Sequence, residues 1–279
     1  MVSEEEKIIR TYLVGDFEEK FFDACLANLR DKENLLRVNN FAYAMRELIR
    51  NVLERLAPKD EVMNAPWYEQ NEDVKDGPTR VQRIKYAIQG WLTDEALHEQ
   101  LHMDVTEVLK NLKNSINELS KYTHVEPETF DVDDKTGDEL SNKVLKYVVN
   151  MFETIKDEKR AVHNAVMECV DEDMIGQFYQ TTNPEIDILS THHEIEGYWV
   201  NEIKKEDDGK GNVHVSVTGS VDVRLQFGSN GDMRRGIGWE TNESFPFKSE
   251  LDVSYKNTYG DVRILEDGDY KIDVDSFYE

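Results

Sequence analysis

The strongest constraint on the fold of this chain is an alternating stretch, VHVSVTGSVDVRLQF, at residues 213–227. Valine, leucine or phenylalanine fills nearly every odd position, and polar residues fill the even positions. Successive side chains of a β-strand point to opposite faces, so this pattern predicts a long strand buried on one face. Gly219 interrupts the apolar series, and we expect a bend or bulge there.

The same period recurs on both sides of this stretch. FPFKSELDVSY (245–255) repeats it, and further strands are expected in HEIEGYWVNEIKK (193–205) and YKIDVDSF (270–277). DDGKGN (207–212) and GSNGD (228–232) have the composition of turns, which favours antiparallel connections.

Upstream of Pro184 the apolar residues recur with helical spacing instead. Helices are expected in FFDACLANL, NNFAYAMRELIRNVLERLAP, RVQRIKYAIQGWL and DVTEVLKNLKNSINELSKY, and then in LSNKVLKYVVNMFETI and KRAVHNAVMECVDEDMIGQFY. We expect the last two to form an antiparallel helical pair. The sequence therefore predicts an α+β fold: an α-helical domain over residues 1–182, with a helix-turn-helix-like corner at 93–121, and an antiparallel β-sheet or sandwich-like domain over residues 185–279.

Composition limits where the protein works and what it binds. No apolar run approaches the ~20 residues that span a bilayer, and the acidic N-terminus lacks the pattern of a secretory signal. The two cysteines, Cys25 and Cys169, suit a reducing compartment, so we expect a cytoplasmic protein with no membrane contact. The net charge of -25 repels phosphate backbones, so contact with nucleic acid requires a local basic site, a metal or a basic partner.

One stretch, HEQLH at residues 98–102, has the H-E-x-x-H spacing of zinc proteases. The zinc interpretation requires an unbroken helix across His102, which would place it on one face with His98. The surrounding LTDEALHEQLHMDVTEVLKNL instead indicates a helix capped by Thr93 or Asp94, a turn at His102 and a new helix. We therefore expect the two histidines not to share a face. A DNA-binding helix-turn-helix is the other interpretation of this corner, but the acidic residues around it would repel DNA.

Two nuclease patterns can be compared with the sequence. A PD-(D/E)xK site needs carboxylates that hold Mg²⁺ and a lysine near strand ends, and Asp187 followed by Glu202 and Lys204 has tolerable spacing. Asp133-Asp134-Lys135, Asp157-Glu158-Lys159 and Asp269-Tyr270-Lys271 match equally well. The R-x(4–6)-H pattern of HEPN ribonucleases is not met, since Arg46 is followed at that spacing by Asn51.

The loop GSNGDMRRGIGWETNESFPF (228–247) is the most unusual stretch. Arg234 and Arg235 could bind phosphate or carboxylate, Trp239 could stack on a base, and the glycines permit close approach. Asp232, Arg234 and Arg235 are therefore the candidate catalytic residues, and Asp187 and Glu202 are the candidate metal ligands. The alternative is a structural connection whose arginines pair with local acids. No nucleophile elbow, Walker loop, dinucleotide fingerprint or cysteine cluster occurs.

Several segments resemble a known bacterial family: NNFAYAMRELIRNVLERLAP, RVQRIKYAIQGWLTDE, ELSKYTHVEPETF, GSNGDMRRG and SFPF. The chain is similar over about residues 35–255 to the predicted pPIWI-associating nucleases, which are found near prokaryotic PIWI-like modules in phage and mobile-element conflict loci. The resemblance implies a defence-associated nuclease acting on DNA or RNA, and as a nuclease it could use Mg²⁺ or Mn²⁺. It carries no catalytic motif onto named residues of this sequence.

A second hypothesis is a non-catalytic sensor or adaptor that binds a partner protein or ligand of a defence module. It is favoured by the strong negative charge and by the missing catalytic signature. Both hypotheses leave self-association into a homo-oligomer open.

Overall fold

The computed structural model describes residues 3–72, 74, 76–171, 174–176, 184–265 and 269–278. The chain divides into two compact units, residues 1–163 and 164–279. The first is helical and the second is built on an antiparallel sheet, so the expected α+β fold is confirmed. The expected domain boundary at 182–185 borders residues outside the described ones and stays a prediction. None of the helices in the described part of the chain is long and apolar enough to cross a bilayer.

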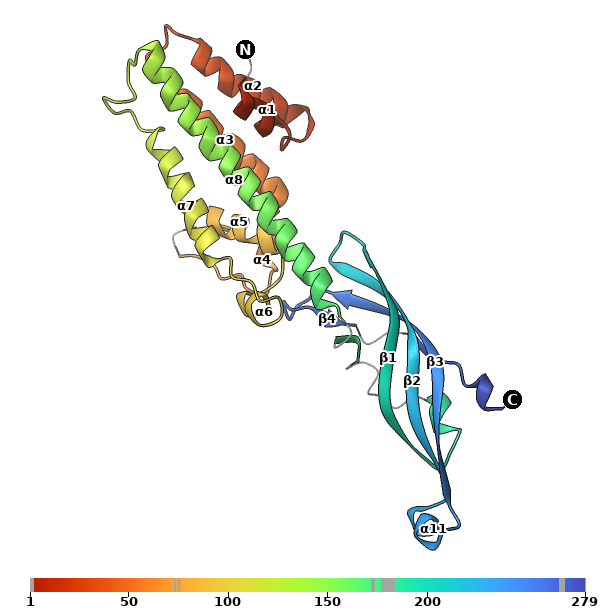
Figure 1. Ribbon diagram of the computed structural model, residues 1–279. Coiled ribbons are helices and arrows are strands. Elements are labelled where there is room, and N and C mark those ends of the chain that lie inside the picture. The colour runs from red at the N-terminus through yellow and green to blue at the C-terminus, as the bar shows by residue number, and fades with distance from the viewer. Residues whose placement is uncertain are drawn as a thin grey trace. The chain divides into compact units, whose positions relative to one another are not determined.

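The helices of the first unit begin and end where the sequence supplies caps and breakers. Before α5, the side chains of Thr79 and Gln82 each bond the other's backbone N–H in a capping box, and Gly90 ends the helix with φ 60°. Figure 1 shows the helices, whose bounds are α1 Glu4–Arg10, α2 Gly15–Arg30, α3 Arg37–Leu56, α4 Lys59–Met63, α5 Arg80–Gln89, α6 Asp94–Glu99, α7 Thr106–Lys121 and α8 Asp134–Cys169.

Helix α3 is the centre of the helical core and contacts α2, α5 and α7. Its apolar stripe was expected from the helical spacing and is buried: Phe41, Met45, Leu48, Ile49 and Val52 are each at most 3% exposed. The opposite face of α3 is polar and carries Arg46, Glu47, Arg50 and Glu54.

The expected antiparallel pair of helices over residues 140–155 and 159–179 is wrong. Residues Asp134–Cys169 form one continuous helix, α8 (Figure 1). The polar segment Asp157–Arg160 suggested a loop between two helices, but its residue types are compatible with a helix. Arg160 pairs with Asp157 at 2.9 Å, one turn away on the same helix. No glycine or proline follows Gly137 within α8, so nothing in the sequence breaks it.

The corner predicted around HEQLH is confirmed. Helix α6 ends at Glu99, and α7 begins at Thr106. His102 adopts a left-handed backbone, with φ 53°, which a helix does not contain. His98 and His102 therefore do not share a helical face, and the spacing required for a zinc protease is lost.

The strands of the second unit form one sheet among the described residues, so the sheet rather than the sandwich alternative is observed. β1, β2, β3 and β4 are neighbours in that order, all antiparallel, and β5 also pairs with β3. The bounds are α10 Pro184–Asp187, β1 His192–Asp207, β2 Asn212–Phe227, α11 Asn230–Arg235, β3 Trp239–Ser254, β4 Arg263–Ile264, β5 Asp269–Ile272 and the 3-10 helix η1 Asp275–Phe277 (Figure 1).

Alternation in β2 was predicted correctly, because the valines and leucine at its odd positions, residues 213–225, are all fully buried. The irregularity expected at Gly219 lies on the neighbouring strand. Register shifts occur in β1 between Ile195 and Gly197 and between Val200 and Glu202, and Val200 is the partner of Gly219. A Cβ at Gly219 would lie 2.2 Å from the carbonyl oxygen of Trp199 and 2.7 Å from the Phe247 ring. Glycine at this position thus permits the close approach of β1.

Candidate functional site

The candidate catalytic residues of the glycine-rich loop lie in or at the end of a short helix, α11, at the tip of the β2–β3 hairpin (Figure 1). Asp232 completes a capping box with Ser229, the N-cap residue of α11. Its Oδ2 accepts from Ser229 N at 2.9 Å and from Ser229 Oγ at 2.7 Å, while Oδ1 accepts from Arg235 Nη2 at 2.7 Å. The hydrogen bond from Ser229 and the guanidinium of Arg235 hold the pKa of Asp232 below its ordinary value. Both oxygens of Asp232 therefore have structural partners, and its catalytic role stays a prediction.

Arg234 differs from its neighbour. Its side chain is exposed and has no hydrogen bond or ion pair within the described part of the chain. The local acid that the structural interpretation required is thus found for Arg235 and not for Arg234.

The candidate metal ligands are not brought together. Asp187 contacts His193 with 3.2 Å between Oδ1 and Nδ1, and Glu202 contacts Lys204 at 3.1 Å. His193, the contact of Asp187, pairs with Leu225 of β2, whereas Glu202 pairs with Thr218. At the rise per residue of a strand, Leu225 and Thr218 are roughly 20 Å apart. Among the described residues, no three His, Cys, Asp or Glu side chains are arranged to hold a metal ion.

A second polar network lies on the exposed face of β2 and β3. His214 Nδ1 is 2.9 Å from Asp252 Oδ1, and its Nε2 is 3.2 Å from Glu250 Oε2. Glu250 also accepts from Ser216 Oγ at 2.6 Å and contacts Lys248 Nζ at 3.0 Å. The hydrogen bond to Asp252 raises the pKa of His214. Because carboxylates contact both ring nitrogens, we interpret the network as a cross-strand brace.

Four arginine side chains lie near one another on the polar face of α3 and on α5. We call these side chains the arginine cluster: Arg46 and Arg50 of α3, and Arg80 and Arg83 of α5. The helical repeat places Arg46 and Arg50 one turn apart, and Arg80 and Arg83 one turn apart on the second helix. Two carboxylates, Glu47 and Glu54, lie among the four guanidiniums.

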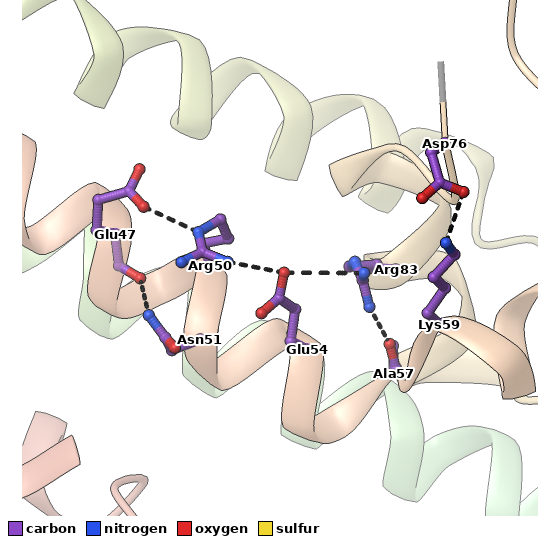
Figure 2. Close-up of polar contacts among 8 residues, drawn as sticks. All are labelled: Glu47, Arg50, Asn51, Glu54, Ala57, Lys59, Asp76 and Arg83. Carbon is purple, nitrogen blue, oxygen red and sulfur yellow. Dashed lines mark hydrogen bonds and ion pairs between the residues drawn. The ribbon is translucent and has the colours of Figure 1, made fainter. Parts of the chain in front are cut away.

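Figure 2 shows how a row of contacts joins the two helices. Arg50 donates from Nε to Glu47 and from Nη1 to Glu54, both at 2.8 Å. Glu54 also lies 3.9 Å from Arg83 Nη2, and Arg83 Nη1 donates to the carbonyl of Ala57 at the end of α3. Arg50 and Arg83 are thus held in place by acceptors from α3.

Arg46 and Arg80 are less well satisfied. Arg46 lies over the ring of Tyr43 at 5.3 Å and reaches Glu47 only at 4.0 Å, while its Nε is buried without a hydrogen-bond partner. Arg80 has no hydrogen bond or ion pair among the described residues. Burial lowers the pKa of Arg80, and the positive charge of Arg46 lowers it further.

Within the part of the chain that the structure describes, the charges of the cluster therefore do not balance: three of the four guanidiniums contact Glu47 or Glu54, and Arg80 contacts neither. Arginine stays protonated at neutral pH, so the excess charge persists. Guanidinium groups bind phosphate through paired N–H donors, and an anion placed between Arg46 and Arg80 would relieve their repulsion. The arrangement is suited to binding a phosphate.

Sequence reasoning missed this cluster, although part of its signal was present. Arg46 was considered only as half of an HEPN pattern with Asn51, whose side chain instead donates to the backbone carbonyl of Glu47 (Figure 2). The sequence alone shows two pairs of arginines at helical spacing, Arg46 with Arg50 and Arg80 with Arg83. Their approach depends on the packing of α5 against α3.

Comparison with known proteins gives matches to two family models. Both are described as predicted pPIWI-associating nuclease; the first matches residues 10–148 and the second residues 155–278. No curated protein and no solved structure gives a significant match. The two family models together account for nearly the whole length, and the chain belongs to the family of predicted pPIWI-associating nucleases.

Proposed function

We propose that this protein is a nuclease that acts on the DNA or RNA of phages or mobile elements in bacterial defence, and that the arginine cluster holds the phosphate backbone of its substrate. The family description names a nuclease associated with a pPIWI protein, which supports both the activity and a protein partner. The observation that carries the binding site is the incomplete pairing of Arg46, whose buried Nε lacks a hydrogen-bond partner, and of Arg80, in a chain of net charge -25.

In such an acidic chain, long-range attraction of nucleic acid is weak. A site where guanidiniums outnumber carboxylates can supply the local attraction that the chain as a whole lacks. The arginine cluster is such a site, with Arg50 and Arg83 already oriented by Glu47, Glu54 and Ala57. Fixed donors of this kind stabilise the charge that develops on a phosphoryl group during cleavage.

A nuclease could use Mg²⁺ or Mn²⁺ as its cofactor. Asp187 lies at the end of α10, and Glu202 lies on β1. The described residues do not bring three suitable metal ligands together. We therefore assign no step of the reaction to a metal.

The activity is tested by incubating the full chain with single- and double-stranded DNA and RNA, with and without Mg²⁺ or Mn²⁺. We expect at least one substrate to be cut, and the rate to fall at least about tenfold in the R46Q/R80Q variant, because two phosphate-binding charges are lost. The matched control is R30Q/R160Q, which removes the same charge from exposed positions of α2 and α8. Intact substrates in every condition would contradict the nuclease proposal and favour a non-catalytic binding module.

A further inference from the structure

The tip of the β2–β3 hairpin carries a stacked pair of aromatic rings. Phe227, the last residue of β2, and Trp239, the first of β3, are paired across the strands. Their ring centroids are 4.3 Å apart and their planes differ by 11°. Phe277 lies parallel to Phe227 at 6.4 Å and packs edge-on against Phe245. The stack is therefore anchored in the core of the sheet.

Trp239, the outer ring of this stack, is exposed to solvent. Trp239 is 55% exposed, although one face of its ring lies on Phe227. A flat ring with one face supported and the other in solvent is a stacking platform, and every nucleic-acid base has a π-face that fits it.

Helix α11 carries an exposed arginine, Arg234, close to Trp239 in the sequence. Arg234 lies on α11, five residues before Trp239, and its guanidinium is exposed and unpaired among the described residues, whereas Arg235 is bound to Asp232. The tip thus offers one aromatic face and one available phosphate-binding group within a short stretch of chain.

Hydrogen bonds within the tip also fix its conformation without a ligand. Ser229 and Asp232 cap α11, and Gly236 ends it in the left-handed conformation with φ 74°. The N–H groups of Ile237 and Gly238 both donate to the carbonyl of Asp232, at 3.1 and 3.2 Å. Binding therefore does not have to order this loop.

From these observations we infer that the hairpin tip binds single-stranded nucleic acid, with an unpaired base stacked on Trp239 and a neighbouring phosphate held by Arg234. Single strands are favoured because the bases of a duplex already stack on one another. The inference rests on the proposed function, since it assigns the strandedness of the nucleic acid that the protein binds.

The test measures the affinity of the full chain for labelled oligothymidylate, oligoadenylate and a hairpin duplex. We expect W239A to weaken single-strand binding about tenfold, the loss typical of one base–aromatic stack, and W239F to retain part of it. R234Q should reduce the slope of log affinity against log salt by about 0.7 for single strands. W199A is the matched control, since Trp199 is another exposed tryptophan of the same sheet, and its Nε1 donates to Asp222. Thermal melting of each variant verifies its fold.

The outcomes separate the two proposals. If W239A and W239F bind single strands as the wild type does while R46Q/R80Q does not, the tip inference fails and the arginine cluster stands. If W239A loses single-strand binding while R46Q/R80Q keeps it, the tip stands and the cluster fails. A wild-type chain that binds no oligonucleotide overturns both. If W239A changes self-association in sedimentation but not oligonucleotide binding, the tip is a protein-docking surface and the inference is wrong.

Discussion

Arg83 of α5 approaches Glu54 of α3, with 3.9 Å between Nη2 and the same Oε1 that Arg50 contacts at 2.8 Å. A single carboxylate is thus shared by guanidiniums from two helices (Figure 2). Glu54 both orients the arginine cluster and neutralises part of its charge, and these two roles can be separated by mutation.

Replacing Glu54 by glutamine should strengthen nucleic-acid binding severalfold at low salt, because the cluster gains one net positive charge. The free energy of unfolding should fall by less than about 1 kcal/mol, since the ion pairs of Glu54 are partly exposed. Oligonucleotide titration and urea unfolding measure the two effects. Glu4→Gln, which removes an equal charge from an exposed pair on α1, is the control. Weaker binding by E54Q would count against a phosphate site at the cluster.

Glu18 is expected to be a strong stabilising residue of the helical unit. It is 5% exposed, lies 2.8 Å from Arg55 Nε and accepts from the N–H of Val14 at 2.7 Å. Glu18→Ala leaves both donors without this partner, and we expect a loss of about 2–3 kcal/mol in the free energy of unfolding. Glu19→Ala breaks a partly exposed pair with Arg10 and should cost less than about 1 kcal/mol. Equal losses for the two variants, by urea unfolding, would refute this assignment.

Gly219→Ala should destabilise the sheet by at least about 2 kcal/mol, because the new Cβ meets the backbone oxygen of Trp199 at 2.2 Å. Gly197→Ala is the matched control on β1, where a Cβ meets nothing within 4 Å, and it should change the stability by less than about 1 kcal/mol. Thermal melting compares the two. A G219A protein as stable as G197A would show that β1 does not approach β2 as described.

The brace at His214 predicts a pH dependence of stability. Its hydrogen bond to Asp252 raises the pKa of His214 above the ordinary 6.5. A histidine whose pKa is higher in the folded state stabilises that state below the unfolded pKa, and this stabilisation is lost as pH rises through the folded pKa. The free energy of unfolding should therefore decline as pH rises above about 6.5. Urea unfolding across this range should show a smaller decline in His214→Asn and in Asp252→Asn. Identical pH profiles for wild type and H214N would contradict the assignment.

The parts of the fold that follow from local patterns could be predicted from the sequence. Residues 213–227 had to form a strand with one buried face, and the left-handed His102 falls where a turn was expected. The break expected between residues 155 and 159 was wrong, because a charged segment without glycine or proline is compatible with helix, and charge alone does not end one.

The site was harder to predict for a physical reason. Asp232 was chosen for its residue type, yet the Ser229-to-Asp232 spacing already indicated a helix cap. The arginine cluster depends on Arg80 approaching Arg46, and this follows from how α5 packs on α3, which no local pattern specifies.

The most direct measurement of the central claim is the salt dependence of nucleic-acid binding by the wild type, R46Q/R80Q and R30Q/R160Q. Each phosphate contact adds about 0.9 to the slope of log affinity against log salt on duplex DNA. We predict that R46Q/R80Q loses close to two contacts, a slope smaller by about 1.8, while R30Q/R160Q keeps the wild-type slope. Equal slopes and affinities in all three proteins would contradict the claim that the arginine cluster holds the phosphate backbone.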